Sequence, residues 1–175
     1  YGPTEAGIHF ERRIDGSPTW STVSGNSETL TLAEGTHVLE VRAIDAAGNA
    51  DLTPATFAWT IDTTSPTVTI NQASSQPDPA GSLPIAFLVT FSEPVAGLDA
   101  EDFTLSSSGQ IAITQTGSLY KVEIVSLASS GQVILSLAAG KVTDLAGNPN
   151  VASTSTDNVV VYSPAPPETT IEAVE

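Results

Sequence analysis

The 175-residue sequence predicts an all-β protein, and two observations lead to that prediction. Short segments rich in Val, Ile, Thr and Phe alternate apolar with polar residues, and Gly, Pro, Asn, Asp or Ser separate them. Helical periodicity is not sustained over any stretch. Strands this short, at a density of about seven per hundred residues, are typical of antiparallel immunoglobulin-like β-sandwiches.

Each expected strand is bounded by residues that favour turns. The strands expected before residue 63 are 7–14, 27–32, 36–44 and 56–62, with 18–23 as a weaker fifth; Asp-Gly at 15–16, Gly25, Gly35 and Gly48 lie between or beside them. The strands expected after it are 67–70, 84–91, 102–106, 110–117, 119–125, 132–138 and 158–162. The segment "AGLDAEDF" (96–103) is expected to form a single helical turn.

An internal repeat predicts how the chain is organised. Asp-x-Ala-Gly-Asn occurs at 45–49 and again at 144–148, each time after a strand-like segment, and the two copies start 99 residues apart. This period matches one sandwich domain. We therefore expect an incomplete first domain over 1–63 that lacks its first strand or strands, and a complete second domain over 64–163.

The last residues, 164–175, are expected to form a linker and one further strand. "PPETTIEAVE" (166–175) can be aligned with "SPTVTINQAS" (65–74), the first strand of the complete domain. The tail is thus the first strand of a following domain, or a donor strand that pairs with the first domain of a neighbouring copy. A sandwich without an outer strand exposes unpaired backbone groups, so we expect something to cover that edge.

Composition excludes several classes of partner and site. Twenty acidic residues against five basic ones give a formal net charge of −15, which argues against nucleic acid and anionic membranes as partners. Without cysteine there is no disulfide and no thiolate chemistry, and two histidines make a zinc centre a poor expectation. No apolar run reaches the ~18 residues needed to span a bilayer, so no membrane insertion is expected within this segment.

The two Asp-x-Ala-Gly-Asn loops have two open interpretations. Turn geometry alone can explain the three residue types, because Asp accepts hydrogen bonds from nearby amides, Gly supplies positive φ and Asn tolerates the left-handed region. As a site, the second loop would lie at the end of the domain where the chain enters, together with other acidic residues. Calcium prefers six to eight oxygen ligands of this kind and would couple domain orientation to calcium. The candidate calcium ligands are Asp62, Glu93, Asp99 or Asp102, and Asp144.

Two sets of motifs resemble a known family. "EGTHVLEVRAIDAAGNADLTPATFAWTIDTTSP" (34–66) is similar to one variety of the bacterial Ig-like repeats found in tandem in large secreted and surface adhesins. "FSEPVAGLDAEDFTLS" (91–106), with "KVTDLAGNPN" (141–150) and "STDNVVVY" (155–162), resembles a second variety. The resemblance implies a non-enzymatic stalk or filament building block, located outside the cell or on its surface, with an unspecified cell-surface or matrix ligand.

The alternative from another class is a carbohydrate- or ligand-binding accessory module of a secreted enzyme. Trp20 and Trp59 would stack on sugars if they were exposed, but Trp59 alternates with Phe57 and Ile61 on one strand face, which favours burial. An enzyme is not expected, because no Gly-x-Ser-x-Gly occurs and the adjacent acids Glu101 and Asp102 would point to opposite faces of a strand.

Overall fold

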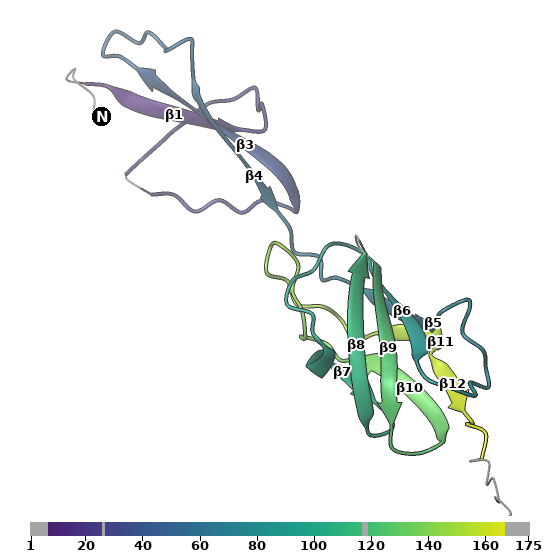
Figure 1. Cartoon of the computed structure of the whole chain (residues 1–175). Coiled ribbons are helices and arrows are strands. Elements are labelled where there is room, and N and C mark those ends of the chain that lie inside the picture. Colours follow the sequence, from purple (N-terminus) through teal and green to yellow (C-terminus); the bar gives the residue numbers. More distant parts are fainter. Residues whose placement is uncertain (1–6, 26, 117–118, 167–175) are drawn as a thin grey trace, which may run out of the picture. The chain divides into compact units, whose positions relative to one another are not determined.

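The structure is a computed structural model that describes residues 7–25, 27–116 and 119–166 (Figure 1). The chain divides into two compact units, Tyr1–Thr63 and Thr64–Glu175. Apart from one 3-10 turn, all the regular elements of the described residues are β-strands. The all-β prediction is therefore confirmed. No helix among these residues has the length and apolar character needed to cross a bilayer.

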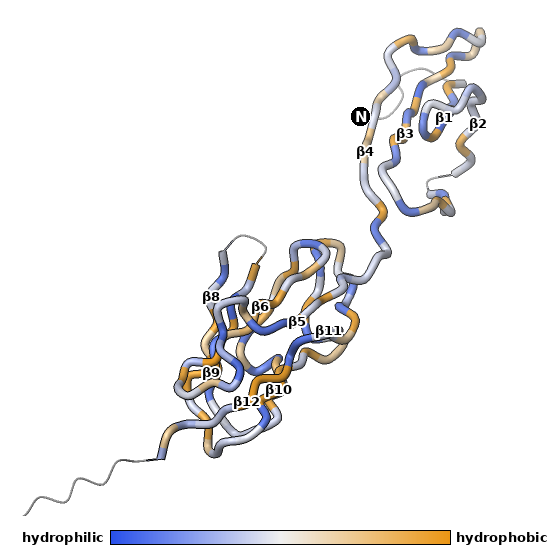
Figure 2. The backbone as a smooth tube through the Cα atoms, turned by 90° about the vertical axis from the view of Figure 1, so that its right-hand side faces the viewer, coloured by the Kyte–Doolittle hydropathy of each residue, from blue (hydrophilic) through white to orange (hydrophobic). Residues whose placement is uncertain are grey.

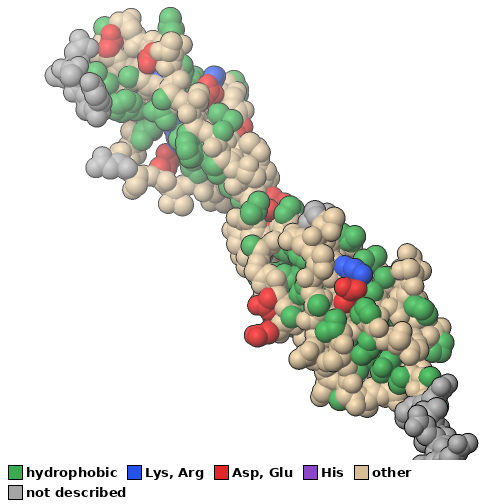
Figure 3. Space-filling view, viewed as in Figure 1, with side chains coloured by type: hydrophobic (Ala, Val, Ile, Leu, Met, Phe, Trp, Pro, Cys, Tyr) green, Lys and Arg blue, Asp and Glu red, His purple; other side chains and the backbone are tan. Residues whose placement is uncertain are grey.

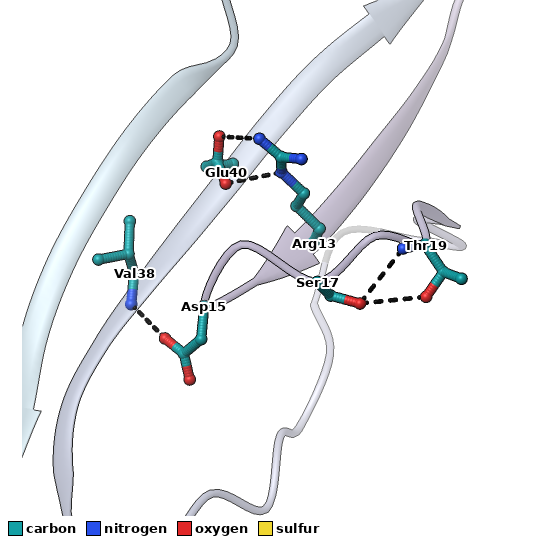
Figure 4. A network of polar contacts seen from close by, with 6 residues as sticks. All are labelled: Arg13, Asp15, Ser17, Thr19, Val38 and Glu40. Atoms are coloured by element: carbon teal, nitrogen blue, oxygen red, sulfur yellow. Dashed lines mark hydrogen bonds and ion pairs between the residues drawn. The ribbon is translucent and has the colours of Figure 1, made fainter.

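The first unit contains one antiparallel sheet with the strand order β2-β1-β3-β4. Its strands are β1 (His9–Ile14), β2 (Ser21–Thr22), β3 (Gly35–Ile44) and β4 (Ala55–Ile61). A turn at Asp15, with φ of 52°, follows β1. The Asp15 carboxylate accepts a hydrogen bond from the amide of Val38 at 2.8 Å (Figure 4). The Asp15 amide donates to the Val38 carbonyl at 2.9 Å. These bonds fix the start of the β1–β3 register.

One face of this sheet is covered by ion pairs. Arg13 donates to both carboxylate oxygens of Glu40 at 2.7 Å (Figure 4), and Arg42 pairs with Glu11 at 2.7 Å. The two guanidinium carbons lie 4.7 and 4.1 Å from the ring centroid of Trp20. Arginine stacks on aromatic faces through cation–π attraction, so Arg13 and Arg42 occupy the ring of Trp20.

The opposite face of the sheet is open and mostly apolar, and it also carries the Arg12–Glu28 ion pair. Ile44 has the only buried apolar side chain among the described residues of the first unit. Phe57 is 64% exposed and stacks on the half-buried Trp59 with ring centroids 5.8 Å apart. The expectation that this strand face would be buried is therefore wrong for Phe57. The physical reason is that no second sheet covers it among the described residues, and Figure 3 shows hydrophobic side chains on the surface here.

The strand expected at 27–32 is also wrong. The described residues of this segment belong to no ladder, although Leu30 and Leu32 are half-buried and Thr29 and Thr31 are exposed. The alternating pattern thus correctly indicated that one face of the segment is partly buried and the other is exposed. A strand assignment requires a hydrogen-bonded neighbour as well, and the first unit offers none to this segment.

The second unit is a two-layer β-sandwich. One layer has the order β12-β10-β7 and the other β11-β5-β6-β9-β8. The strands are β5 (Val68–Gln72), β6 (Ile85–Phe91), β7 (Phe103–Leu105), β8 (Gly109–Thr116), β9 (Leu119–Leu127), β10 (Gly131–Leu137), β11 (Thr154–Asp157) and β12 (Val159–Tyr162). The expected helical turn is the 3-10 turn η1 (Ala100–Asp102).

The core of this sandwich comes from alternate residues of neighbouring strands. Ile85, Phe87 and Val89 of β6 are fully buried, and so are Val122 and Ile124 of the adjacent β9. Figure 2 shows hydrophobic residues distributed along β9 and β10. Burying a large apolar side chain contributes about 1.5–3 kcal/mol, so β6 is a principal source of the stability of the unit.

One strand was not anticipated. β11 pairs in parallel with β5, whereas β12 pairs antiparallel with β10, so the last part of the chain passes from one sheet to the other. All four residues of β11 are exposed and its sequence is "TSTD". A strand without apolar residues leaves no alternation in the sequence, which is why it was missed.

Candidate metal centre

The two Asp-x-Ala-Gly-Asn loops form the same turn. The Oδ1 atom of Asp45 accepts hydrogen bonds from the amides of Ala47 and Asn49 at 2.9 and 2.8 Å, and its Oδ2 accepts from the Asn49 side chain at 2.8 Å. The equivalent distances around Asp144 are 2.8, 2.8 and 2.9 Å, with Ala146 and Asn148 as donors. The turn interpretation therefore accounts for the aspartate and the asparagine.

The glycine of each loop has a local role as well. Gly48 and Gly147 have φ of 89° and 95°, a conformation that other L-residues rarely adopt. Each glycine amide also donates to the carbonyl of the loop aspartate. The three identities of the motif thus follow from turn geometry, and any function of Asp144 as a ligand would come in addition.

Hydrogen bonds keep both aspartates ionised. For Asp45, donation by Asn49 lowers the pKa from the ordinary value. For Asp144, burial opposes the charge most strongly, but the donors on Asn148, Ala146 and Gly147 together hold the pKa below its ordinary value. A buried carboxylate that remains charged is suited to binding a cation.

Asp144 differs from Asp45 in its surroundings. It is 5% exposed, and one of its carboxylate oxygens lies within 4.8 Å of a carboxylate oxygen of Glu93, in the same unit. Glu93 follows Ser92, whose hydroxyl accepts from the Thr67 amide at 3.0 Å. Two of the residues proposed from the sequence are thereby close together, whereas Asp62 belongs to the first unit.

Asp99 and Asp102 have a different function. The Asp99 carboxylate accepts from the Glu101 amide at 2.8 Å, and the Asp102 carboxylate accepts from the Asp99 amide at 3.0 Å. Together they form a capping box around η1. Lys141 lies 3.9 Å from Asp102. These two acids shape the β6–β7 loop, and the described geometry groups neither of them with Glu93 and Asp144.

Asn150 is a structural residue that the sequence did not reveal. It is 2% exposed; its Oδ1 accepts from the amides of Lys141 and Val142, and its Nδ2 donates to the carbonyls of Ala138 and Val151. The 99-residue spacing was an available signal, since it aligns Asn150 with Asp51, which caps its own turn by accepting from Thr53. Asn150 holds the loop that positions Asp144.

His37 makes structural hydrogen bonds, and His9 lies on the surface. The ring nitrogens of His37 lie 2.8 Å from the Asp15 carboxylate and 2.9 Å from the Ala33 carbonyl. His9 is exposed at the start of β1.

The two layers of the second unit, with β5 and β11 joining the first and last parts of that unit, define it as an immunoglobulin-like sandwich. A family model described as "Bacterial Ig-like domain" matches residues 62–161. The chain therefore belongs to the bacterial Ig-like domain family, as its motifs indicated. Glu93 and Asp144 both lie within the matched residues.

Comparison with solved structures gives a weaker likeness. The chain is similar to a structure titled "D00-D0 domain of Intimin", with 16% sequence identity and a TM-score of 0.33, covering 89% of this chain and 84% of the other. A search of curated proteins found no match.

Proposed function

We propose that the chain is a non-enzymatic, extracellular structural repeat, a stalk or filament building block that transmits tension. The supporting observation is the pairing of the first and last parts of the second unit. β5 pairs in parallel with β11 at Thr69–Thr154 and Asn71–Asp157, and the Val151 amide donates to the Pro66 carbonyl at 3.0 Å. Tension applied to the two ends of the unit loads these bonds together in shear, whereas an antiparallel hairpin opens one bond at a time.

Single-molecule pulling tests this function, because the chain has no native cysteine and attachment points can be chosen freely. Attachment through Ser65→Cys and Ser163→Cys loads β5 against β11 in shear. Attachment through Ser130→Cys and Ser163→Cys peels β12 from β10, since Gly131 lies opposite Tyr162. We expect a clearly higher unfolding force in the first geometry. Equal forces in the two geometries would contradict a load-bearing function.

We also propose that the C-terminal tail completes the first unit of a neighbouring copy. Residues 168–175 lie outside the described residues, so the support comes from the second unit. The tail aligns in sequence with β5, and β5 pairs with β11. The 99-residue period aligns Thr154 with Ala55, at the start of β4. The outer edge of β4 pairs with no described strand. Electron microscopy of the full chain should show filaments that are absent from a variant ending at residue 165.

Calcium binding is a further proposal for Asp62, Glu93 and Asp144. Within the second unit, carboxylate oxygens of Glu93 and Asp144 lie within 4.8 Å of one another, close enough to share one cation, and carboxylates are the ligands that calcium prefers. A ligand that binds only the folded state raises stability by mass action. The melting temperature of the second unit should therefore be higher with calcium than with a chelator. Identical melting curves would contradict the proposal.

A carbohydrate-binding function is the second candidate, supported by the stacked and partly exposed Phe57 and Trp59. Aromatic rings of this kind can stack on sugar rings. Saturable glycan binding that is lost in Trp59→Ala and kept in Trp20→Ala would favour it. Trp20 is the matched control, because it is already stacked against two arginines.

A further inference from the structure

A short segment of the first unit crosses the apolar face of its sheet. This segment, residues 28–33 between β2 and β3, is called the strap, and it forms one wall of a groove of about 450 Å³. Leu30 of the strap lines the groove together with Phe10 of β1 and with Leu39 and Val41 of β3. The strap pairs with no strand in the part of the chain that the structure describes, so other contacts hold it in place.

His37 of β3 makes one of these contacts at the end of the strap. Its Nε2 atom lies 2.9 Å from the carbonyl oxygen of Ala33, and its Nδ1 atom lies 2.8 Å from a carboxylate oxygen of Asp15. His37 is 8% exposed, and its ring centroid lies 5.8 Å from that of Trp59. The side chain thus joins β3, the turn after β1 and the strap.

Both of these acceptors require a proton on the ring nitrogen that faces them. A carbonyl oxygen only accepts, and so does an ionised carboxylate; the hydrogen bond from His37 lowers the pKa of Asp15 and keeps it ionised. A neutral imidazole has a single N–H, whereas the imidazolium has two. The geometry around His37 is therefore that of the charged ring. Accordingly, the bonds to Ala33 and to Asp15 raise the pKa of His37 above 6.5.

Loss of one proton breaks the bond to the strap and keeps the bond to the turn. A hydrogen bond to a carboxylate is charge-assisted and stronger than one to a carbonyl, so the proton that stays is the one on Nδ1, facing Asp15. The lone pair of Nε2 then faces the carbonyl oxygen of Ala33, and the two repel. Asp15 is also held by the amide of Val38 at 2.8 Å (Figure 4), so the strap is the side that moves.

The other charged groups beside the strap form pairs of their own. Arg12 and Glu28 make an ion pair in which bonding to Glu28 raises the pKa of Arg12 and bonding to Arg12 lowers the pKa of Glu28. Glu34 accepts a hydrogen bond from the Thr63 hydroxyl at 2.8 Å. Strand β4 has no titratable side chain. Of the side chains that face the strap, His37 is the one that changes charge between pH 6 and 9.

We propose that His37 is a pH-sensitive latch. While both ring nitrogens carry protons, the latch holds the strap at Ala33, and Leu30 covers part of the apolar face. When one proton is lost, the strap is released and the apolar side chains of the groove become accessible, while β1, β3 and β4 stay paired. The latch acts within the first unit, so it is independent of load bearing by the second.

Nuclear magnetic resonance of the imidazole nitrogens tests the charge state in the full chain. We expect two protonated ring nitrogens for His37 at pH 6 and the loss of one proton at a midpoint above pH 6.5. His9, the other histidine of the chain, is exposed at the start of β1 and serves as the internal reference. A midpoint for His37 at or below that of His9 would overturn the latch.

Thiol labelling measures release of the strap. Because the chain has no cysteine, single cysteines can be placed at Leu30, which is half-buried in the groove wall, and at its exposed neighbour Thr31. The ratio of the labelling rates of Leu30→Cys and Thr31→Cys removes the common effect of pH on the thiolate. We expect the ratio to rise at least about fivefold from pH 6 to pH 9, with the same midpoint as the titration of His37.

Substitution of the latch should remove this pH dependence. In both cysteine backgrounds, His37→Gln should give the same ratio at pH 6 and pH 9, and His9→Gln should leave the rise unchanged. Hydrogen exchange of the β3 amides, corrected for the intrinsic effect of pH, checks that the sheet stays paired. The latch is contradicted by a constant ratio in the chain that retains His37, by a rise that persists in His37→Gln, or by loss of protection in β3 together with the strap, which would be unfolding of the whole unit.

Discussion

Asn148 donates a side-chain hydrogen bond to Asp144 at 2.9 Å, and 99 residues earlier Asn49 donates the same bond to Asp45 at 2.8 Å. The repeated turn thus supplies a natural control for the clustered carboxylates. Both aspartates close the same loop, but Asp144 also has a carboxylate oxygen within 4.8 Å of one of Glu93. Any property found at one loop and not at the other comes from these surroundings and not from the turn.

The first prediction uses this pair. Asp144→Asn should abolish the stabilisation of the second unit by calcium, while Asp45→Asn should leave it intact. In the unsubstituted chain, calcium at about a hundredfold excess over its Kd should add about 2.7 kcal/mol to the free energy of unfolding. Differential scanning calorimetry with calcium and with chelator measures it. A calcium response that survives in Asp144→Asn would exclude the cluster as its source.

The second prediction concerns Asn150. Asn150→Ala should lower the free energy of unfolding of the second unit by about 2–3 kcal/mol, since it leaves buried amides and carbonyls without partners. Asp51→Ala, at the equivalent exposed position, should have a smaller effect. Urea denaturation followed by circular dichroism compares them. Equal losses would mean that burial of the side chain is unimportant.

The third prediction concerns packing by β6. Phe87→Ala should cost the second unit about 3–5 kcal/mol through lost burial and the cavity that remains. Val125→Ala, at a position 45% exposed in the neighbouring β9, should cost less than about 1 kcal/mol. Thermal unfolding separates the two. A loss at Phe87 no larger than at Val125 would mean that the core has rearranged.

The fourth prediction concerns Gly109 at the start of β8. A Cβ atom there would lie 2.2 Å from the carbonyl oxygen of Ser126, so the backbone must shift. Gly109→Ala should destabilise the second unit by about 1–3 kcal/mol. Gly81→Ala is the control, because a Cβ atom there meets nothing within 4 Å. Chemical denaturation midpoints provide the comparison, and indistinguishable midpoints would argue against the close approach.

The fifth prediction is a pH dependence of the first unit. Hydrogen bonding to the Ala33 carbonyl and to Asp15 raises the pKa of His37 above 6.5, so its contribution to stability is complete below that value and is lost as pH rises through the folded pKa. Bonding to His37 lowers the pKa of Asp15 below 3.8, so its contribution is lost as pH falls through the folded pKa. Stability should peak between about pH 4 and 6.5.

Fluorescence of Trp59 reports this transition, because its ring centroid lies 5.8 Å from that of His37. The melting temperature of the first unit should fall from pH 6 to pH 9 in the unsubstituted chain. His37→Gln should flatten that part of the profile. An unchanged slope in His37→Gln would assign the pH dependence to other groups.

Most of the strands could be predicted from the sequence, because alternation and turn residues are local properties. The segments 84–91 and 132–138 became β6 and β10 within one residue at each end. The predictions for segment 27–32 and for strand β11 were wrong in opposite ways. The first has the pattern of a strand without a neighbour, and the second has a neighbour without the pattern.

The candidate site was likewise predictable from the sequence only in part. Glu93 and Asp144 could be placed near each other by reasoning about which loops share one end of a sandwich. Asp99 and Asp102 could not be separated from them, because a capping box and a ligand set use the same residue type. Asn150 was missed, since burial is invisible in a single asparagine.

The sequence by itself determined the all-β class, the 99-residue repeat, the turn chemistry of the two Asp-x-Ala-Gly-Asn loops and the net charge of −15, from which we expect no nucleic-acid partner. Each of these depends on residues close together in the chain or on simple counts. Only the tertiary structure decided which carboxylates meet, which apolar face stays uncovered and which strand joins the two ends of the second unit. Those depend on contacts between residues far apart in sequence, which no local pattern encodes.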